Sequence, residues 1–193
     1  MKVPIGLKKV AAMCVLKHKD KFLLLKRANE PNKGMYVPVG GKLEPFEDQI
    51  TAVIRETHEE AGILLESVKF CGILIETSPT KYNWISYIYM AEIDDQIPPY
   101  CDEGVLEWIA IIDLLTVPTP PTDRWIYKYL LENKPFAFSA IYDEQLNMLE
   151  LIEEIEGLVR YGKNKKENKE LKSAIESISS VAKLVFGRLV FGL

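Results

Sequence analysis

Three glutamates close together in the chain, Glu56, Glu59 and Glu60, have the residue type and spacing of a metal site. At about 100° per residue, a helix through them would spread the side chains over roughly 100° of its surface, so all three can face one point. Like charges repel at this spacing, and a hard divalent cation would offset the repulsion because carboxylate oxygens are its preferred ligands. Such an ion would also bridge an anionic substrate to a chain of net charge −4. The alternative is an acidic, solvated helix face.

Two neighbouring features would support such a site. Glu47 lies about two helical turns before Arg55, so the two can form an ion pair. Such a pair would orient the glutamates without itself binding the metal. Gly40 and Gly41 predict a turn just before the helix. Because they have no Cβ, their backbone could approach a phosphate or offer a carbonyl oxygen to the metal.

The whole stretch 41–63, GKLEPFEDQITAVIRETHEEAGI, fits the Nudix box, G-x5-E-x7-R-E-U-x-E-E-x-G-U, in which U is aliphatic. The one departure is Thr57, which stands where an aliphatic residue is usual. Over about residues 8–157 the chain therefore resembles the Nudix (MutT-like) pyrophosphohydrolases. The resemblance implies an α/β (α+β) fold, a Nudix-type α/β/α sandwich around a mixed β-sheet, with Mg²⁺ as cofactor and Mn²⁺ as the alternative.

The same resemblance assigns roles to individual residues. The implied catalytic residues are Glu47, Arg55, Glu56, Glu59 and Glu60. The implied metal ligands are the Gly40 carbonyl, Glu56, Glu59, Glu60 and Glu103. Glu103 is included because many members add a glutamate from a loop some forty residues past the box; Asp102 is the alternative ligand, and a surface acid without a role is the other explanation.

Substrate choice in this family depends on residues outside the box. The strand that begins at Tyr36 is similar to that of MutT-like oxidised-purine triphosphatases, which carry a tryptophan at this position. Asp123 and Trp125 match the acidic, tryptophan-flanked loop with which those enzymes recognise the base, one by hydrogen bonding and the other by stacking. Alternatively, Asp123 is the N-cap of a helix over 125–132. The implied substrate-binding residues are Tyr36, Gly40, Gly41, Asp123 and Trp125.

The activity implied is cleavage of a nucleoside triphosphate, such as the oxidised purine nucleotide 8-oxo-dGTP, to a nucleoside monophosphate and pyrophosphate by metal-assisted attack of water. Two alternatives stay open. Pro79 lies near the position of a proline in ADP-ribose-cleaving relatives, which leaves ADP-ribose or another nucleoside diphosphate derivative as substrate. The other alternative is a Nudix-fold sensor that binds its ligand without cleaving it, although such sensors tend to lose box glutamates and this chain has all of them.

Hydrophobic patterning predicts the elements that position these residues. The helix with the glutamates begins after Gly41 and ends at Gly62. Residues 136–142 and 149–152 predict a terminal hairpin, with a helix over 146–156 as the alternative. The other predicted elements are a hairpin over 8–27, strands over 35–39, 68–76, 82–93 and 105–109, and a helix over 125–132. Strands on both sides of two helices predict a mixed sheet.

Composition limits the class of protein. With 193 residues, 48% of them hydrophobic, the chain can bury one substantial core, and we assign the domain to residues 1–157. The sequence contains no run of about 18 apolar residues, so no membrane-spanning helix is predicted. No secretory leader is evident, and three cysteines without a CxxC pair favour a reducing, cytoplasmic location. A pI of about 5.4 gives no electrostatic footprint for duplex nucleic acid. The partner that the Nudix resemblance implies is a small-molecule nucleotide.

Residues 158–193 are predicted to be a linker and a C-terminal amphipathic helix. The linker is rich in lysine and asparagine. The apolar positions of the helix recur every three or four residues, at Leu171, Ile175, Ile178, Ala182, Val185 and Leu189. The stripe could dock on the domain, pair with a second copy in a homodimer, or lie on a membrane surface. Docking and self-association are favoured because apolar stripes are usually buried against protein.

Overall fold

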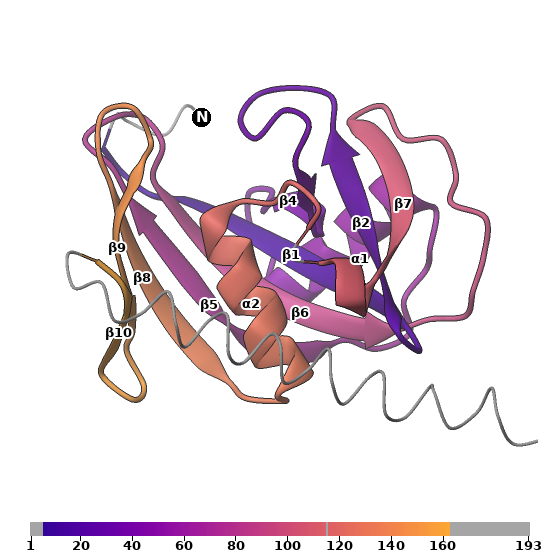
Figure 1. Cartoon of the computed structure of the whole chain (residues 1–193). Coiled ribbons are helices and arrows are strands. Elements are labelled where there is room, and N and C mark those ends of the chain that lie inside the picture. The colour runs from indigo at the N-terminus through magenta and orange to yellow at the C-terminus, as the bar shows by residue number, and fades with distance from the viewer. Residues whose placement is uncertain (1–5, 115, 163–193) are drawn as a thin grey trace, which may run out of the picture.

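The computed structural model describes residues 6–114 and 116–162, and its centre is a mixed, ten-stranded β-sheet (Figure 1). The strand order is β10-β9-β8-β5-β6-β1-β2-β3, with β4 paired to β1 and β7 paired to β2. The strands are β1 (Lys9–His18), β2 (Lys21–Arg27), β3 (Tyr36–Val37), β4 (Val39–Lys42), β5 (Lys69–Thr77), β6 (Trp84–Glu92), β7 (Gly104–Ala110), β8 (Phe136–Tyr142), β9 (Met148–Glu153) and β10 (Leu158–Tyr161). The helices are α1 (Gln49–Ala61), η1 (Ile111–Asp113) and α2 (Pro121–Leu131).

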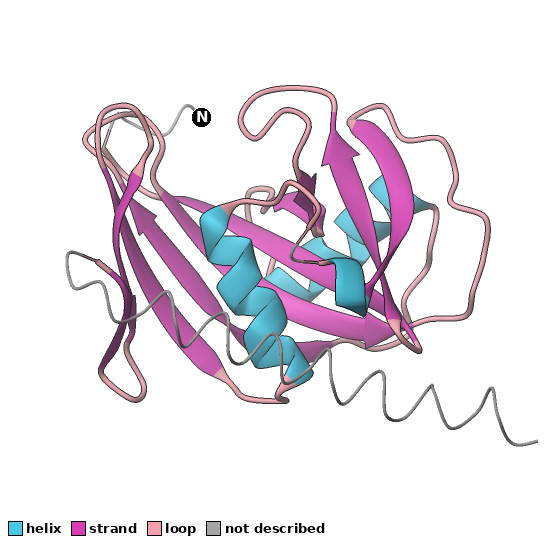
Figure 2. Cartoon of the chain, viewed as in Figure 1, coloured by secondary structure: helices cyan, strands magenta, loops and turns pink. Residues whose placement is uncertain are grey.

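Both faces of the sheet are buried, each under one long helix. Side chains alternate along β1, so that Val15 enters one hydrophobic core while Cys14 and Leu16 enter the other. Ala52 and Val53 of α1 belong to the second core, whereas Trp125 and its neighbours on α2 belong to the first. Figure 2 shows α2 in front of the sheet and α1 behind it. The α/β/α sandwich around a mixed sheet is therefore confirmed.

The C-terminal end of the sheet settles one alternative and changes one boundary. β8 and β9 pair as an antiparallel hairpin, so the terminal hairpin is confirmed and a helix over 146–156 is wrong. β10 then pairs with β9, so residues 158–161, which the sequence predicts to be linker, extend the sheet. The predicted helix after residue 171 lies outside the described residues, and the homodimer stays a prediction.

The two glycines before α1 lie in a strand, and the predicted turn is wrong. Gly40 and Gly41 form part of β4 and pair with Met13 and Ala12 of β1. Gly40 has a φ of 136°, and a Cβ there would come within 2.3 Å of the Ala12 carbonyl oxygen. Close backbone approach across the β1–β4 pair therefore requires glycine at this position.

Local sequence fixes the ends of both helices. The Asp48 carboxylate caps α1 by accepting from the Ile50 and Thr51 amides, and Gly62 ends the helix in the left-handed conformation. α2 begins at Pro121, four residues earlier than predicted, with Pro120 as its N-cap and no side-chain cap bond. Asp123 lies within the first turn, so its interpretation as an N-cap is wrong.

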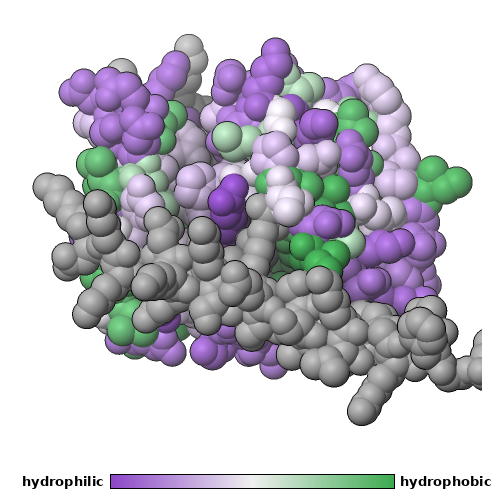
Figure 3. All heavy atoms as spheres, in the orientation of Figure 1, coloured by the Kyte–Doolittle hydropathy of each residue, from purple (hydrophilic) through white to green (hydrophobic). Residues whose placement is uncertain are grey.

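The described surface is mainly polar on the face that carries α2. In Figure 3, hydrophilic side chains predominate where this surface is visible, and apolar ones form small separate groups. Among residues 6–114 and 116–162, no helix combines the length and hydrophobicity needed to cross a membrane. The larger apolar side chains lie mostly in the two cores instead.

Candidate active site

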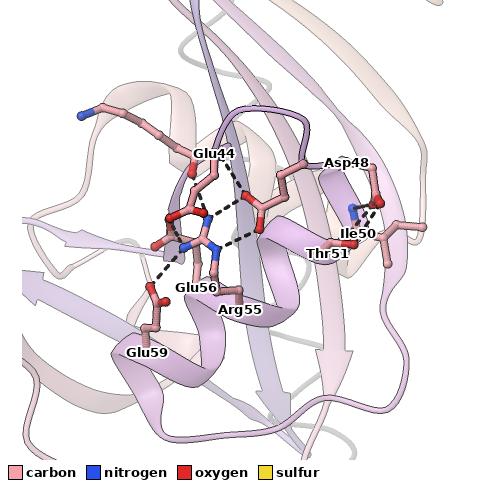
Figure 4. Close-up of polar contacts among 9 residues, drawn as sticks. Glu44, Asp48, Ile50, Thr51, Arg55, Glu56 and Glu59 are labelled. Atoms are coloured by element: carbon pink, nitrogen blue, oxygen red, sulfur yellow. Dashed lines mark hydrogen bonds and ion pairs between the residues drawn. The ribbon is translucent and has the colours of Figure 1, made fainter. Parts of the chain in front are cut away.

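Arg55 is the centre of a carboxylate network on α1 (Figure 4). Its Nε and Nη2 donate to the two oxygens of Glu47, both at 2.8 Å, so the predicted ion pair is bidentate. Its Nη1 donates to Glu56 and to Glu59, each at 3.0 Å. Nη2 also donates to the Lys42 carbonyl at 3.1 Å, which ties the network to β4. Arg55 is thus committed to positioning carboxylates and has little capacity left to bind a substrate.

β4 positions two of the glutamates against its backbone. The Gly40 amide donates to the Glu60 carboxylate at 2.8 Å. A Cβ on Gly41 would come within 2.5 Å of a Glu56 carboxylate oxygen, so the absence of a side chain at Gly41 lets Glu56 lie directly on the strand. Thr57, the one departure from the box, is fully buried and satisfies its hydroxyl by donating to the Val53 carbonyl at 2.7 Å.

Glu103 is brought to the same place from a distant part of the chain. Its charge contributes to raising the pKa of both Glu56 and Glu60, so it lies within electrostatic range of them. Its carboxylate pairs with Arg27 at 3.2 Å, and its carbonyl accepts from the Ala28 amide at 2.8 Å. Asp102, the alternative ligand, acts instead on the pKa of the exposed Tyr100. Of the two acids in this loop, the structure brings Glu103 to the glutamates.

The electrostatics of the glutamates suit a bound cation. Burial raises the pKa of Glu60 to about 7, and the charges of Glu103 and Glu56 act in the same direction. Burial also raises the pKa of Glu56, although Arg55 opposes the shift. Neighbouring carboxyl groups that resist ionisation would be relieved by a divalent cation, for which their oxygens are the right donors.

The carboxylates of the three α1 glutamates do not converge on one point in this structure. Across residues 6–114 and 116–162, no three acidic, histidine or cysteine side chains gather at metal-binding distance. Arg55 holds Glu56 and Glu59, while the Gly40 amide holds Glu60, so the expectation that all three face one point is not met in this arrangement. The donor set of four glutamates still fits Mg²⁺, because it offers only hard oxygen ligands on one helix face and one adjoining loop.

The fold joins Tyr36 to the loop before α2 but places the Trp125 ring in the core. The Tyr36 amide donates to the Pro118 carbonyl at 2.8 Å and the Thr119 hydroxyl donates to the Tyr36 carbonyl at 2.7 Å, which joins the loop before α2 to the strand leading into Gly40. Trp125 is 4% exposed within the core, and the Arg160 guanidinium lies 5.7 Å from its ring centroid. Its ring is therefore not available for stacking on a base.

Asp123 lies apart from Trp125 because residues two positions apart on a helix do not face each other. It is 8% exposed, and burial together with the charge of Glu76 raises its pKa to about 8. Glu76 itself accepts hydrogen bonds from Tyr82 and Tyr142. The sequence analysis missed Glu76, since a glutamate at the end of an apolar strand carries no local signal that its charge acts on Asp123 of α2.

Arg27 was missed as well. It ends β2 opposite Gly104 of β7, and this pairing is what carries it to Glu103. A Cβ on Gly104 would come within 2.1 Å of the Lys26 carbonyl oxygen, so glycine is needed where the two strands meet. The one signal for Arg27 in the sequence was its place at a strand end, followed by a loop rich in turn residues.

Comparison with known proteins decides the family, because the model of the NUDIX domain matches residues 7–133. The chain belongs to the Nudix family. It is 30% identical over 126 residues to the uncharacterized Nudix hydrolase YvcI of Bacillus subtilis, a match covering 63% of this chain and 78% of the relative. It is 26% identical over 120 residues to the human diphosphoinositol polyphosphate phosphohydrolase 3-alpha, covering 59% and 71%.

A solved structure supports the same conclusion. The MutT protein from Bacillus halodurans matches with a TM-score of 0.68 and 25% identity, over 76% of this chain and 98% of that one. The fold prediction and the resemblance drawn from the box are both confirmed. As a Nudix hydrolase, the protein belongs to a class that acts on pyrophosphate bonds in nucleotide derivatives.

Proposed function

We propose that this Nudix hydrolase cleaves a nucleoside triphosphate to a nucleoside monophosphate and pyrophosphate, with Mg²⁺ as cofactor and Mn²⁺ as the alternative. The observation that carries the proposal is the complete carboxylate set: three glutamates of α1 held by Arg55 and the Gly40 amide, with Glu103 within electrostatic range of Glu60. Sensors that bind without cleaving would not need this set. The residues present therefore favour catalysis.

In this scheme each group has a separate task. Glu56, Glu59, Glu60 and Glu103 would hold the cation, which supplies charge neutralisation to the phosphates and activates water when bound. One of the α1 glutamates would accept the proton of the attacking water, for which it needs to lie within hydrogen-bond reach. Arg55 positions the carboxylates through its four side-chain and backbone partners. Arg27, half-buried at the edge of the cluster, is a cation that could meet a phosphate.

For the base, the proposal relies on Asp123 and on the loop that binds Tyr36. The Pro118 and Thr119 contacts connect this loop to the strand that continues into β4, and so to the glutamates. Because α1 and α2 cover opposite faces of the sheet, such a nucleotide would have to pass the edge where this loop meets the strand, with its phosphates toward α1 and its base toward the first turn of α2. We leave Trp125 out of the site because the Arg160 guanidinium already lies over its ring.

The test is a substrate panel with the full chain and Mg²⁺. The panel contains dGTP, 8-oxo-dGTP, ADP-ribose and a diphosphoinositol polyphosphate, the last because of the human relative. We expect triphosphates to be cleaved fastest, with release of pyrophosphate. Preferred cleavage of ADP-ribose or of the inositol compound would contradict the substrate assignment, and binding of nucleotides without any cleavage would indicate a sensor.

Replacing a metal ligand tests the site itself. Glu60→Gln should lower kcat about a thousandfold, because loss of metal-assisted charge stabilisation costs several kcal/mol in the transition state. The Gly40 amide can still donate to the glutamine oxygen, so the fold should persist. Glu66→Gln, at an exposed glutamate just past the box, is the matched control and should leave kcat unchanged. Equal rates for the wild type and Glu60→Gln at saturating Mg²⁺ would contradict the proposal.

A further inference from the structure

A row of mostly apolar side chains crosses the sheet from β6 to its edge strand β10. Strand pairing joins the members of the row in the order Ile85 of β6, Ile75 of β5, Ser139 of β8, Ile152 of β9 and Val159 of β10. Paired residues of neighbouring strands point to the same side of a sheet, so the row is continuous. All its members except Ser139 are β-branched apolar residues.

Alternation along the strands shows on which side of the sheet the row lies. Leu74 and Leu151 belong to the core under α2. Their neighbours Ile75 and Ile152 therefore point to the opposite side, which is the side that carries α1. Ile141 of β8 lies on this side too, because the preceding residue, Ala140, belongs to the core under α2.

The core under α1 does not reach this row. On β6 that core includes Tyr89 and Ala91, with Tyr87 packed against it, but none of the residues in the row. We call the uncovered part of the sheet the open face, and it consists of the five residues of the row together with Ile141. At its outer end, Ile141 is 42% exposed and Val159 is 48% exposed. An apolar sheet face normally packs against another layer, and neither α1 nor α2 covers this one.

The chain leaves the described part of the structure beside the open face. β10 ends at Tyr161, two residues after Val159, and residue 162 is the last one described. The eight residues 163–170 can span at most about 28 Å before Leu171. The open face is about 19 Å wide from β10 to β6, at about 4.8 Å per strand. The apolar stripe that begins at Leu171 can therefore reach every part of it.

The stripe also matches the open face in length and in chemistry. A helix over 171–189 would be about 28 Å long at about 1.5 Å per residue. β5, with nine residues, runs for about 30 Å across the middle of the sheet. The side of the sheet that carries α2 offers no comparable partner, since hydrophilic side chains predominate where that surface is visible (Figure 3).

Charge favours the same placement. Residues 143–156, which include the β8–β9 turn and β9, contain six acidic residues and no basic one. Residues 163–172 contain five lysines and two glutamates. Glu150 pairs with Ile141 across β8 and β9, so one of the acidic residues lies on the side of the sheet that forms the open face. The lysine-rich stretch is thus attracted to the edge of the sheet that it must pass.

We propose that residues 171–189 form a helix that docks in cis on the open face, next to α1. Its stripe packs against the apolar row, and the lysines of 163–172 lie along the acidic edge formed by β9 and the turn before it. α1 and the docked helix then cover the two halves of one side of the sheet. The proposal is independent of the proposed function, because no residue of the glutamate site belongs to the open face.

A thiol in the middle of the open face reports whether the face is covered. Ser139→Cys is a nearly isosteric change on β8, and the native Cys14, Cys71 and Cys101 are buried, so they give a slow background. In the full chain, the introduced thiol should react with a soluble thiol reagent about tenfold more slowly than when Ile178→Asp is added. The aspartate places a charge in the stripe and prevents docking. Ser180→Asp adds the same charge on the opposite side of the predicted helix, so it is the matched control and should leave the rate unchanged.

A reciprocal measurement needs no introduced thiol, so it keeps the proposal testable if Ser139→Cys does not fold. Val159→Asp places a charge on the open face, and hydrogen exchange of the amides of 171–189 should then accelerate about tenfold. Leu158→Asp is the control. Leu158 is 42% exposed on the same strand, but it pairs with Glu153 and points to the other side of the sheet. Exchange over 171–189 should be the same in Leu158→Asp as in the wild type.

Four results would overturn the proposal. Fast labelling of Ser139→Cys in the otherwise native chain would show that the face is uncovered, and slow labelling that Ile178→Asp does not change would show that something else covers it. Protection that disappears on dilution would assign the helix to a second copy of the chain. Protection that appears only with phosphatidylserine vesicles would assign the covering to a membrane surface.

Discussion

Replacing Asp123 with asparagine should stabilise the fold at alkaline pH, even though it alters a side chain that we place in the substrate site. Asp123 is 8% exposed and has no cation as partner among the described residues. Its pKa is about 8 in the fold, against 3.8 for an aspartate in water. At any pH between these two values, the unfolded chain has released the Asp123 proton while the folded protein still holds it.

The sign and size of the effect follow from this difference. Because the folded state binds more protons, the free energy of unfolding falls as pH rises through this window. Each unit costs about 1.4 kcal/mol, so the fold should lose roughly 4 kcal/mol between pH 5 and pH 8 through Asp123, and little more above pH 8. Asparagine cannot ionise, so position 123 contributes no pH dependence to the free energy of unfolding in Asp123→Asn.

The measurement is urea unfolding of both proteins from pH 5 to pH 9. The difference in the free energy of unfolding between Asp123→Asn and the wild type isolates Asp123, because the other titrating groups are common to both. We expect this difference to move in favour of Asp123→Asn by roughly 4 kcal/mol from pH 5 to pH 8 and then to level off. A difference that is constant with pH, or that moves in favour of the wild type, would refute the argument that Asp123 is a buried neutral acid.

Three further predictions concern the glutamate site and the assembly. Gly40→Ala should destabilise the fold by several kcal/mol, because its Cβ would meet the Ala12 backbone at a φ of 136°, whereas Gly41→Ala should mainly lower kcat by displacing Glu56. Melting curves and kcat of the two variants check this contrast, and similar melting temperatures would contradict it. Arg55→Lys keeps the charge but loses the bidentate bond to Glu47 and the bonds to Glu56 and Glu59, so kcat should fall about a hundredfold with the fold retained. Activity and circular dichroism test this, and an unchanged kcat would show that the network does not position the glutamates. Light scattering of the full chain should give twice 22.0 kDa if the predicted homodimer forms, and a mass of one chain would contradict it.

Local sequence was enough to predict the elements that carry the chemistry. Gly62 was predicted to end a helix on which Arg55 and the three glutamates share one side, and the ion pair with Glu47 followed from spacing alone; its bidentate geometry and the Asp48 cap came from the structure. Two of the misplacements had a backbone cause. Gly40 and Gly41 suggested a turn, but their missing Cβ atoms serve the β1–β4 pairing, and Pro121 begins α2 because proline suits the first helical position.

The sequence by itself determined the family, the α/β/α architecture and the catalytic helix, because these depend on residues within a turn or two of one another and on the alternation of apolar side chains. Only the tertiary structure decided which distant residues meet them. Arg27 reaches Glu103 across 76 positions through the β2–β7 register, and Tyr142 reaches Glu76 across 66 through the β5–β8 pairing. Strand register brings such pairs together, and no local pattern encodes a partner that lies on another strand.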